Sequence, residues 1–321
     1  MDQSTIPNPQ SEIAIIPVRT WAKSLPSRSH LERNEDAYWS ARNGVAHAVI
    51  DGMGGSRRVV DGKEIGGEHA AAGLRAVLEE RLQDLPNNVS ISAARELLAA
   101  VIAEGNARVF REVNAEGNLP PEQIPEGKTA DEVMAAACLT AAILCEGGRR
   151  AVISQNGDTR CYLYSEGELL LLTEDQDAVN MDFTQGALTS EQADAIGEAL
   201  DTFSGFDVGK LDPAARKYYA QRHLVFGQLG DSPEAAAPVF STIQIHPGDS
   251  LLLTSDGVHD NLTADEIAAS MSSIDPAATL VDRADARSGE RALPDPNDLT
   301  VPYNYRAHQD DATALVVKIE W

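Results

Sequence analysis

Short apolar runs separated by polar residues, Gly and Pro recur along most of the chain. Apolar runs of this length, bounded by turn residues, are typical of strands rather than helices. We expect strands over residues 13–18, 45–50, 138–145, 150–155, 160–164, 168–173, 249–255 and 312–319. Because only Ser-Glu-Gly separates 160–164 from 168–173, this pair predicts a hairpin, and we expect much of the sheet structure to be antiparallel.

Three other segments carry apolar residues at helical spacing. Residues 64–84 and 90–113 are rich in Ala, Leu, Glu and Arg, which favour helices. Residues 263–273 begin with Thr-Ala-Asp-Glu, the pattern of an N-terminal capping box, ahead of an apolar run. The strand-like runs are therefore grouped around two long helical stretches and do not alternate strictly with helices.

Residues 174–240 differ from the sequence on either side, because they mix many acidic residues with few long apolar runs. We interpret this segment as an insertion between core strands. Its expected helices are short and polar, so we expect a mobile flap over a surface site rather than a second core. With a loose tail at 1–12, residues 13–321 would then form a single domain.

The composition narrows the range of partners. The chain has 26 Lys and Arg against 50 Asp and Glu, a formal net charge of −24. So acidic a surface repels phosphate backbones and anionic lipids, and we expect neither nucleic acid nor membranes as partners. The N-terminus lacks the pattern of a signal peptide, and the three Cys form no CxxC pair. We therefore expect a cytoplasmic protein without disulfides.

Carboxylates stand at the ends of three apolar runs. Asp51 follows Ala-Val-Ile, Asp256 follows Leu-Leu-Leu-Thr-Ser, and Asp310 shortly precedes the last apolar run. In a layered fold these side chains can gather at one edge of the core, where a divalent cation would relieve their mutual repulsion. Oxygen ligands without an organised His or Cys set favour Mg²⁺ or Mn²⁺. The Gly residues after Asp51 would let the backbone approach the ion, so the carbonyl of Gly52 is a further candidate ligand.

A simpler interpretation exists for each of these positions taken alone. Asp-Gly is a very common turn dipeptide, and Asp often begins or ends strands. The metal site is favoured by the recurrence of the pattern and by its order along the chain.

The segments that hold these residues resemble, in order, the motifs of a known family. They read RNEDAY (33–38), VIDGMGG (49–55), SQNGDTRCYLY (154–164), LLLTSDGVHDNLTADEI (251–267) and DDATALVV (310–317). In order and spacing they are similar to the metal-dependent serine/threonine phosphatases of the protein phosphatase 2C type, in a bacterial-like form. The resemblance spans nearly the whole chain. It implies an α+β fold, a four-layer α-β-β-α sandwich of two antiparallel sheets flanked by helices, with a flap insertion.

The resemblance also implies a site for two Mg²⁺ or Mn²⁺ ions. The residues with implied roles are Asp51 as the bridging ligand, Gly52 through its carbonyl, Asp256, Asp310, Glu35 beside a metal-bound water, and Asp36 behind the cluster. Asp158, together with Asp256, corresponds to a third, weaker metal position found in some members. The implied reaction is hydrolysis of phosphoserine or phosphothreonine in proteins, in which the ions lower the pKa of a bridging water that attacks phosphorus as hydroxide.

One departure from the family pattern concerns phosphate binding. Leu31 stands where the family commonly has an Arg that grips the substrate phosphate. Arg33 and Arg28, or Arg57 after the glycines, are the candidates to replace it.

Other departures leave the candidate ligands intact. Met53 occupies the position of a His in animal members, Asp311 replaces a frequent Asn, and His259 replaces a frequent aromatic residue. Protonation of the leaving group would fall to water or to an acid not yet identified. His259 and His308 lie next to candidate ligands and are worth testing in that role.

The implied partner is a phosphorylated protein, and we expect a monomer that opposes a Ser/Thr kinase. Two alternatives stay open: a catalytically weak member that serves as a binding or sensing module, suggested by Leu31, and a phosphatase of a small phosphorylated metabolite. The tyrosines and basic residues within 216–222 would be either a contact surface for substrate or an amphipathic helix that packs its tyrosines.

Rival catalytic motifs are missing or incomplete. EGKT (126–129) lacks the first Gly of a phosphate-binding loop, and no GxSxG occurs. The seven His form neither an HxH nor an HExxH pattern.

Overall fold

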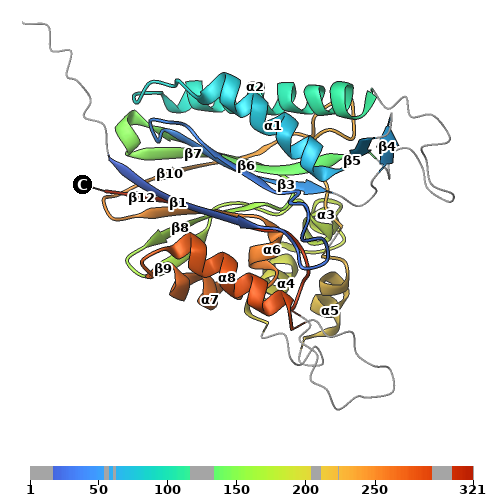
Figure 1. Cartoon of the computed structure of the whole chain (residues 1–321). Helices are drawn as coiled ribbons and strands as arrows, with labels where there is room; N and C mark the ends of the chain where they lie inside the picture. The colour runs from blue at the N-terminus through green and yellow to red at the C-terminus, as the bar shows by residue number, and fades with distance from the viewer. Residues whose placement is uncertain are drawn as a thin grey trace, which may run out of the picture.

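The computed structural model describes residues 17–53, 58–60, 63–115, 134–203, 211–222, 224–290 and 306–320. Two five-stranded sheets lie face to face (Figure 1). Sheet A contains, in spatial order, β1 (Val18–Leu25), β12 (Ala312–Ile319), β11 (Ser250–Thr254), β8 (Arg160–Ser165) and β9 (Glu168–Leu171). Sheet B contains β10 (Val239–Gln244), β7 (Arg150–Asn156), β6 (Ala136–Cys145), β3 (Ala46–Met53) and β2 (Ala37–Ser40). All neighbouring strands within the two sheets are antiparallel.

Helices cover the outer face of each sheet (Figure 1). On sheet B lie α1 (Gly67–Leu82) and α2 (Ile91–Arg108), and on sheet A lie α7 (Ala264–Ser270) and α8 (Pro276–Ser288). Shorter elements are the hairpin β4 (Arg58–Val60) and β5 (Lys63–Ile65), the helical turns η1 (Val109–Val113) and η5 (Glu146–Gly148), and α6 (Asp256–His259). The four layers confirm the predicted α-β-β-α sandwich. Among the helices in the described ranges, none combines the length and apolar character needed to cross a membrane.

The apolar core has three parts, which explains why the central strands read as continuous apolar runs. Successive side chains of a strand point to opposite faces of its sheet. In β3, Ile50 packs against α1 and α2, whereas its neighbour Val49 packs between the two sheets. In β11, Leu252 faces α7 and α8, whereas Leu251 and Leu253 face the opposite sheet. Both faces of each sheet are buried, so both sets of positions must be apolar.

Most differences between the predicted and observed strands lie at sheet edges, and the helix α8 was not predicted. The edge strand β1 covers Val18–Leu25 rather than 13–18, and residues 13–16 lie outside the described part of the chain. The edge strands β2 and β10 were not predicted, and β5 occupies positions assigned to the start of a helix. Edge strands are less completely buried than central ones, so their apolar pattern is weak, and pairing with a neighbouring strand determines where they form.

The insertion between β9 and β10 contains α3 (Ala178–Thr184), α4 (Ser190–Thr202) and α5 (Pro213–Ala220). These helices lie at the right-hand end of the sandwich in Figure 1. One small apolar cluster includes Val179, Ile196 and Tyr218, and a second includes Phe203 and Leu211. The insertion therefore contains small apolar clusters of its own, which were not predicted. Short amphipathic helices can bury their few apolar positions against one another, which the polar composition of the segment concealed.

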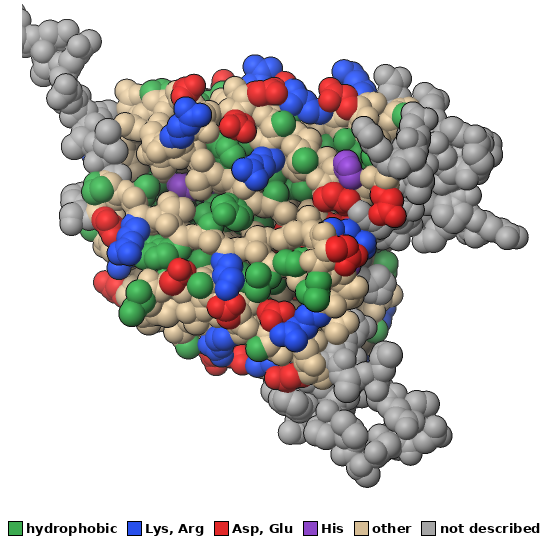
Figure 2. Space-filling view, viewed as in Figure 1, with side chains coloured by type: hydrophobic (Ala, Val, Ile, Leu, Met, Phe, Trp, Pro, Cys, Tyr) green, Lys and Arg blue, Asp and Glu red, His purple; other side chains and the backbone are tan. Residues whose placement is uncertain are grey.

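Charged side chains are interspersed over the helical layers. In Figure 2, Lys and Arg alternate with Asp and Glu on the outer helices, while apolar side chains gather between the layers. Between α1 and α2, Arg81 pairs with Glu104 and Arg108 with Glu80, each at 2.7 Å. Because such exposed pairs each contribute less than about 1 kcal/mol, the sandwich is held together mainly by its buried clusters.

Candidate metal centre

Asp51, Asp256 and Asp310 meet at one end of the sandwich, although they come from different sheets. Asp51 lies near the end of β3 in sheet B, Asp256 follows β11 and opens α6, and Asp310 precedes β12. Strands β3 and β11 end, and β12 begins, at the right-hand end of the molecule in Figure 1. The three carboxylates line one open cleft with a volume of about 320 Å³.

Most of the other predicted site residues lie around this cleft. Glu35 and Arg33 line it from the loop between β1 and β2, Gly52 from β3, and Asp158 from the turn between β7 and β8. Asp36 does not line the cleft. Its buried carboxylate lies behind the cleft and accepts a hydrogen bond of 2.6 Å from Ser255 Oγ.

Without a bound cation, the negatively charged forms of the cleft carboxylates are unfavourable. Burial raises the pKa of Asp51 well above its ordinary value, and the charges of Asp36 and Asp310 raise it further. Burial likewise raises the pKa of Asp256, followed by the charges of Asp51 and Asp310. For Asp158, burial raises the pKa to about 7. Buried like charges of this kind are stabilised when a cation is added.

The oxygen atoms of the cleft fit a hard cation. Asp256 Oδ1 is buried and has no hydrogen-bond partner among the described residues. A buried carboxylate oxygen without a donor is costly unless a cation takes the place of the missing hydrogen bond. Asp256, His308 and Asp310 also bring ligand atoms within 4.8 Å of one another. The residues present therefore suit Mg²⁺ or Mn²⁺, whose preferred ligands are carboxylate and carbonyl oxygens.

Gly52 allows a close approach of three backbone segments. A Cβ at this position would lie 2.3 Å from the carbonyl oxygen of Glu35 and 2.5 Å from that of Gly67, at the start of α1. Any side chain here would separate β3 from the loop that carries Glu35. Packing of the protein backbone thus provides a reason for this Gly in addition to the predicted approach of an ion. Gly54 and Gly55 lie outside the described residues.

The structure separates the arginine candidates for phosphate binding. Arg33 lines the cleft, with Nε 3.4 Å from Glu35 Oε1. Arg28 instead forms a bidentate pair with Asp285 of α8, at 2.7 Å from Nε and 2.6 Å from Nη2. Arg28 is therefore engaged away from the cleft, and Arg57 lies outside the described residues. Leu31, two residues before Arg33, is 68% exposed.

A chain of ion pairs leads from the insertion to the cleft. Arg222, just after α5, places Nε 3.3 Å from Asp260 Oδ2, and the same oxygen lies 3.2 Å from His308 Nδ1. His308 Nε2 in turn lies 3.8 Å from Asp310 Oδ2. Burial opposes charge on both partners, yet His308 lowers the pKa of Asp260 and Asp260 raises the pKa of His308. This chain couples the position of the insertion to that of His308.

Two other predictions from the sequence concern His259 and the tyrosines of α5. His259 is buried outside the cleft, where Nδ1 lies 3.0 Å from Thr254 Oγ1, and burial lowers its pKa. Tyr218 is buried, and Tyr219 packs edge-on against Phe203 at a ring distance of 5.6 Å. The tyrosines of this helix therefore pack inside the insertion.

Two arginines that join the insertion to the sandwich, Arg160 and the buried Arg306, were not singled out from the sequence. Arg160 of β8 pairs with Asp175 at 2.7 Å and with Asp201 of α4 at 2.9 Å. Arg306 donates to the carbonyl oxygens of Leu200 and His259, among others, at 2.7 and 2.9 Å. Arg160 follows the candidate ligand Asp158 by two positions, which was an available signal, whereas nothing in the local sequence distinguishes Arg306.

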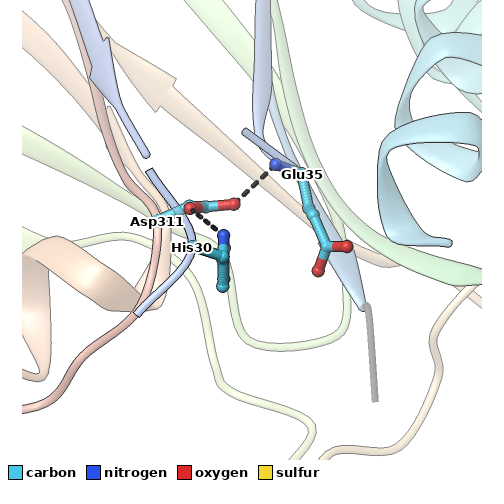
Figure 3. Close-up of side chains that lie close together, drawn as sticks. All are labelled: His30, Glu35 and Asp311. Carbon is cyan, nitrogen blue, oxygen red and sulfur yellow. Dashed lines mark hydrogen bonds and ion pairs between the residues drawn. The ribbon is translucent and has the colours of Figure 1, made fainter. Parts of the chain in front are cut away.

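A second group of possible ligand atoms comes from His30 and Glu35, which line the cleft, and from Asp311 next to them (Figure 3). The carboxylate of Asp311 accepts the backbone N–H of Glu35 at 2.5 Å and that of Ser27 at 2.6 Å, one on each oxygen. His30 Nδ1 lies 3.7 Å from the oxygen that serves Ser27. A carboxylate oxygen of Glu35 lies within 4.8 Å of the ligand atoms of the other two side chains, without a hydrogen bond to either in Figure 3. Both oxygens of Asp311 therefore accept hydrogen bonds from the loop between β1 and β2.

The chain is similar to one known protein family and to several solved structures. The family model for protein phosphatase 2C matches residues 28–295. The serine/threonine phosphatase PstP/Ppp of Mycobacterium tuberculosis has a TM-score of 0.62 at 22% identity, covering 95% of this chain and 99% of that one. The catalytic domain of PstP in complex with 2 manganese ions gives 0.60 at 21% identity, with coverage of 95% and 99%. Stp1 from Staphylococcus aureus gives 0.60 at 18% identity, with 96% of each chain covered.

Identities this low demonstrate a shared fold and nothing finer. No curated protein matches the chain. The family model, however, covers well over half of the sequence and includes the segments that supply Glu35, Asp51 and Asp256. The chain belongs to the protein phosphatase 2C family, as its motifs predicted.

Proposed function

We propose that the protein hydrolyses phosphoserine and phosphothreonine in proteins, using Mn²⁺ or Mg²⁺. The observation that carries this proposal is the convergence of Asp51, Asp256 and Asp310 from two sheets in one open cleft, with an Asp256 oxygen left without a donor. The manganese ions in the related PstP domain support the choice of metal, and the named activity of the bacterial neighbours supports the choice of substrate.

The proposed ligands are Asp51, the Gly52 carbonyl, Asp256 and Asp310 for two ions, with Glu35 beside them and Asp158 for a third. When bound, these ions would supply Lewis-acid chemistry, because they neutralise phosphoryl charge and make a water molecule more acidic. The protein's own part is to fix the carboxylates before substrate arrives, with Asp36 holding Ser255 behind them. Preorganised charge of this kind is the main contribution that proteins make to phosphoryl transfer.

Arg33 is the proposed phosphate-binding residue among the described arginines. Its guanidinium lines the cleft and pairs loosely with Glu35, at 3.4 Å, so it can turn toward an entering phosphate at little cost. A planar guanidinium can donate two parallel hydrogen bonds to phosphate oxygens.

Release of phosphate from phosphoserine and phosphothreonine peptides tests the proposal. We expect turnover with Mn²⁺, its loss on chelation, and a loss of at least about 100-fold in kcat/KM for Asp256→Asn. The matched control is Asp249→Asn, because Asp249 is a buried carboxylate in the turn before β11, at the other end of that strand from Asp256. Turnover that survives chelation, or an Asp256→Asn enzyme as active as Asp249→Asn, would rule the mechanism out.

The exposed position of Leu31 favours one alternative, a catalytically weak member that binds metal and phosphoprotein without turnover. Calorimetry that detects Mn²⁺ binding while no phosphopeptide or phosphorylated metabolite is hydrolysed would support this alternative. Turnover of metabolites alone would point instead to a small-molecule phosphatase. The leading proposal also includes that the protein is monomeric and cytoplasmic and that it opposes a Ser/Thr kinase.

A further inference from the structure

The loop between β1 and β2 carries much of the cleft but has no regular structure of its own. Residues 26–36 cross from sheet A to sheet B without forming a helix or strand, and they include Arg33, Glu35 and Asp36. Within the loop, His30 donates its N–H to Ser27, and Arg33 donates its N–H to His30, both at 3.1 Å. These turns shape the loop, but they do not fix it to the rest of the site. Contacts from outside the loop must do so.

Asp311 makes those contacts at both ends of the loop. One carboxylate oxygen accepts the N–H of Ser27 at 2.6 Å, and the other accepts the N–H of Glu35 at 2.5 Å. Asp311 is only 2% exposed, so water does not compete for either oxygen. Hydrogen bonds from backbone N–H groups to a buried carboxylate are stronger than those to a neutral acceptor. The loop is thus held at its entry and at the residue that faces the cleft.

The main chain of Asp311 is also joined to the other ligand-bearing segments. Its N–H donates to Asp310 Oδ1 at 2.8 Å. Its carbonyl oxygen lies so close to Gly257 that a Cβ there would be 2.0 Å away, which brings the start of α6 and Asp256 against it. One residue therefore connects the segments of Glu35, Asp256 and Asp310.

We propose that Asp311 is a positioning residue that sets the place of Glu35 and Arg33 relative to the metal-binding carboxylates, and that this role requires a carboxylate. An Asn at this position would offer one acceptor oxygen and one NH₂ group. The NH₂ group would face a backbone N–H, and one of the two buried donors would lose its partner. The inference rests on the proposed function, because the residues that Asp311 positions are those of the proposed metal and phosphate site.

The test compares Asp311→Asn with Asp249→Asn. Asp249 is 4% exposed, accepts the backbone N–H of His246 at 2.7 Å, and has the His246 ring 3.6 Å away. Like Asp311, it is a buried carboxylate that accepts a backbone N–H, but it lies at the far end of β11. Both proteins are examined by thermal unfolding, by hydrogen exchange of the peptide covering 26–36 without metal, and by calorimetric titration with Mn²⁺.

For Asp311→Asn we expect faster exchange in 26–36 and Mn²⁺ binding weakened by roughly 10- to 100-fold, as is usual when a residue behind a metal ligand is changed. For Asp249→Asn we expect a smaller loss of thermal stability, because the amide oxygen can still accept the N–H of His246, and we expect both other properties to be unchanged. If Asp311→Asn does not fold, Ser27→Pro is the second variant, because it removes one of the two N–H donors to Asp311. It should give smaller changes of the same kind in hydrogen exchange and in Mn²⁺ binding.

The inference is overturned if exchange in 26–36 is the same in Asp311→Asn and the wild type, or if Asp249→Asn weakens Mn²⁺ binding equally. Failure of the proposed function has a different signature. In that case the wild-type protein itself binds no Mn²⁺ or hydrolyses no phosphopeptide, whereas the exchange experiment still decides whether Asp311 holds the loop.

Discussion

Ser255 Oγ donates a hydrogen bond of 2.6 Å to the carboxylate of Asp36, although 219 residues separate the two in sequence. The same oxygen accepts the N–H of Thr313 at 2.9 Å. Ser255 thereby joins the loop before β2, the start of α6 and the start of β12. Each of these segments carries a carboxylate that lines the cleft, so the hydroxyl lies behind the site as a common support.

Replacing Ser255 with Ala should lower the free energy of unfolding by about 1–3 kcal/mol, because a buried N–H loses its acceptor and a buried carboxylate loses a donor. Urea unfolding measures this change. The matched control is Ser288→Ala, whose buried hydroxyl donates only to the nearby Asp285 carbonyl at 2.8 Å. Phosphatase activity should fall in the first variant and persist in the second. Equal activity in the two would show that Ser255 supports the fold but not the site.

Replacing Arg33 with Ala should reduce kcat/KM on phosphopeptides by roughly 10- to 100-fold, since a charge-assisted hydrogen bond to phosphate is lost. Arg28→Ala is the control, because Arg28 is of the same type, lies in the same loop and is paired with Asp285. We expect Arg28→Ala to keep its kcat/KM. A larger loss of activity in Arg28→Ala than in Arg33→Ala would reverse the assignment of the phosphate-binding residue.

Replacing Gly52 with Ala should destabilise the protein by about 1–3 kcal/mol, because the new Cβ would overlap the carbonyl oxygens of Glu35 and Gly67. Gly197→Ala in α4 has the opposite expectation. A Cβ at Gly197 meets nothing within 4 Å, so the better helix former should stabilise the protein by about 0.5–1 kcal/mol. Denaturant unfolding measures the stability of both variants. If Gly52→Ala leaves the stability unchanged, the three backbone segments are packed less closely than the structure indicates.

The metal-free protein should lose stability as the pH rises. Burial raises the pKa of Asp158 from 3.8 to about 7, so the folded state binds more protons than the unfolded state between these values. Stability therefore falls from about pH 4 to above pH 7, by an amount on the order of a few kcal/mol. Asp51 and Asp256 act in the same direction, because their pKa values are also raised.

Urea unfolding in chelator at pH 5 and pH 8 measures this dependence. The free energy of unfolding of Asp158→Asn should depend less on pH than that of the wild type. For the wild type at pH 8, Mn²⁺ at 100 times its Kd should raise the free energy of unfolding by about 2.7 kcal/mol. A metal-free wild type that is more stable at pH 8 than at pH 5, with no effect of Asp158→Asn, would contradict the raised pKa of Asp158.

Much of the fold could be predicted from the sequence because it depends on local patterns. Central strands such as β3 and β11 are buried on both faces and therefore appear as unbroken apolar runs. The edge strand β2 was missed, since its short, partly polar sequence becomes a strand only when β3 pairs with it. The two apolar clusters of the insertion were missed for a similar reason, because neither α4 nor α5 has a continuous apolar run.

By itself, the sequence determined the central strands of both sheets, the two long helices on sheet B, the family, and the Asp residues that stand at the ends of apolar runs. Only the tertiary structure decided that Arg33 faces the cleft while Arg28 pairs with Asp285, and that Asp311 holds the loop of Glu35. The physical reason is the range of the interactions. Strand and helix patterns arise between neighbours along the chain, whereas the Arg28 and Asp311 contacts join residues 257 and 276 positions apart. The packing of α8 on sheet A brings the first pair together, and the packing of the two sheets brings the second pair together.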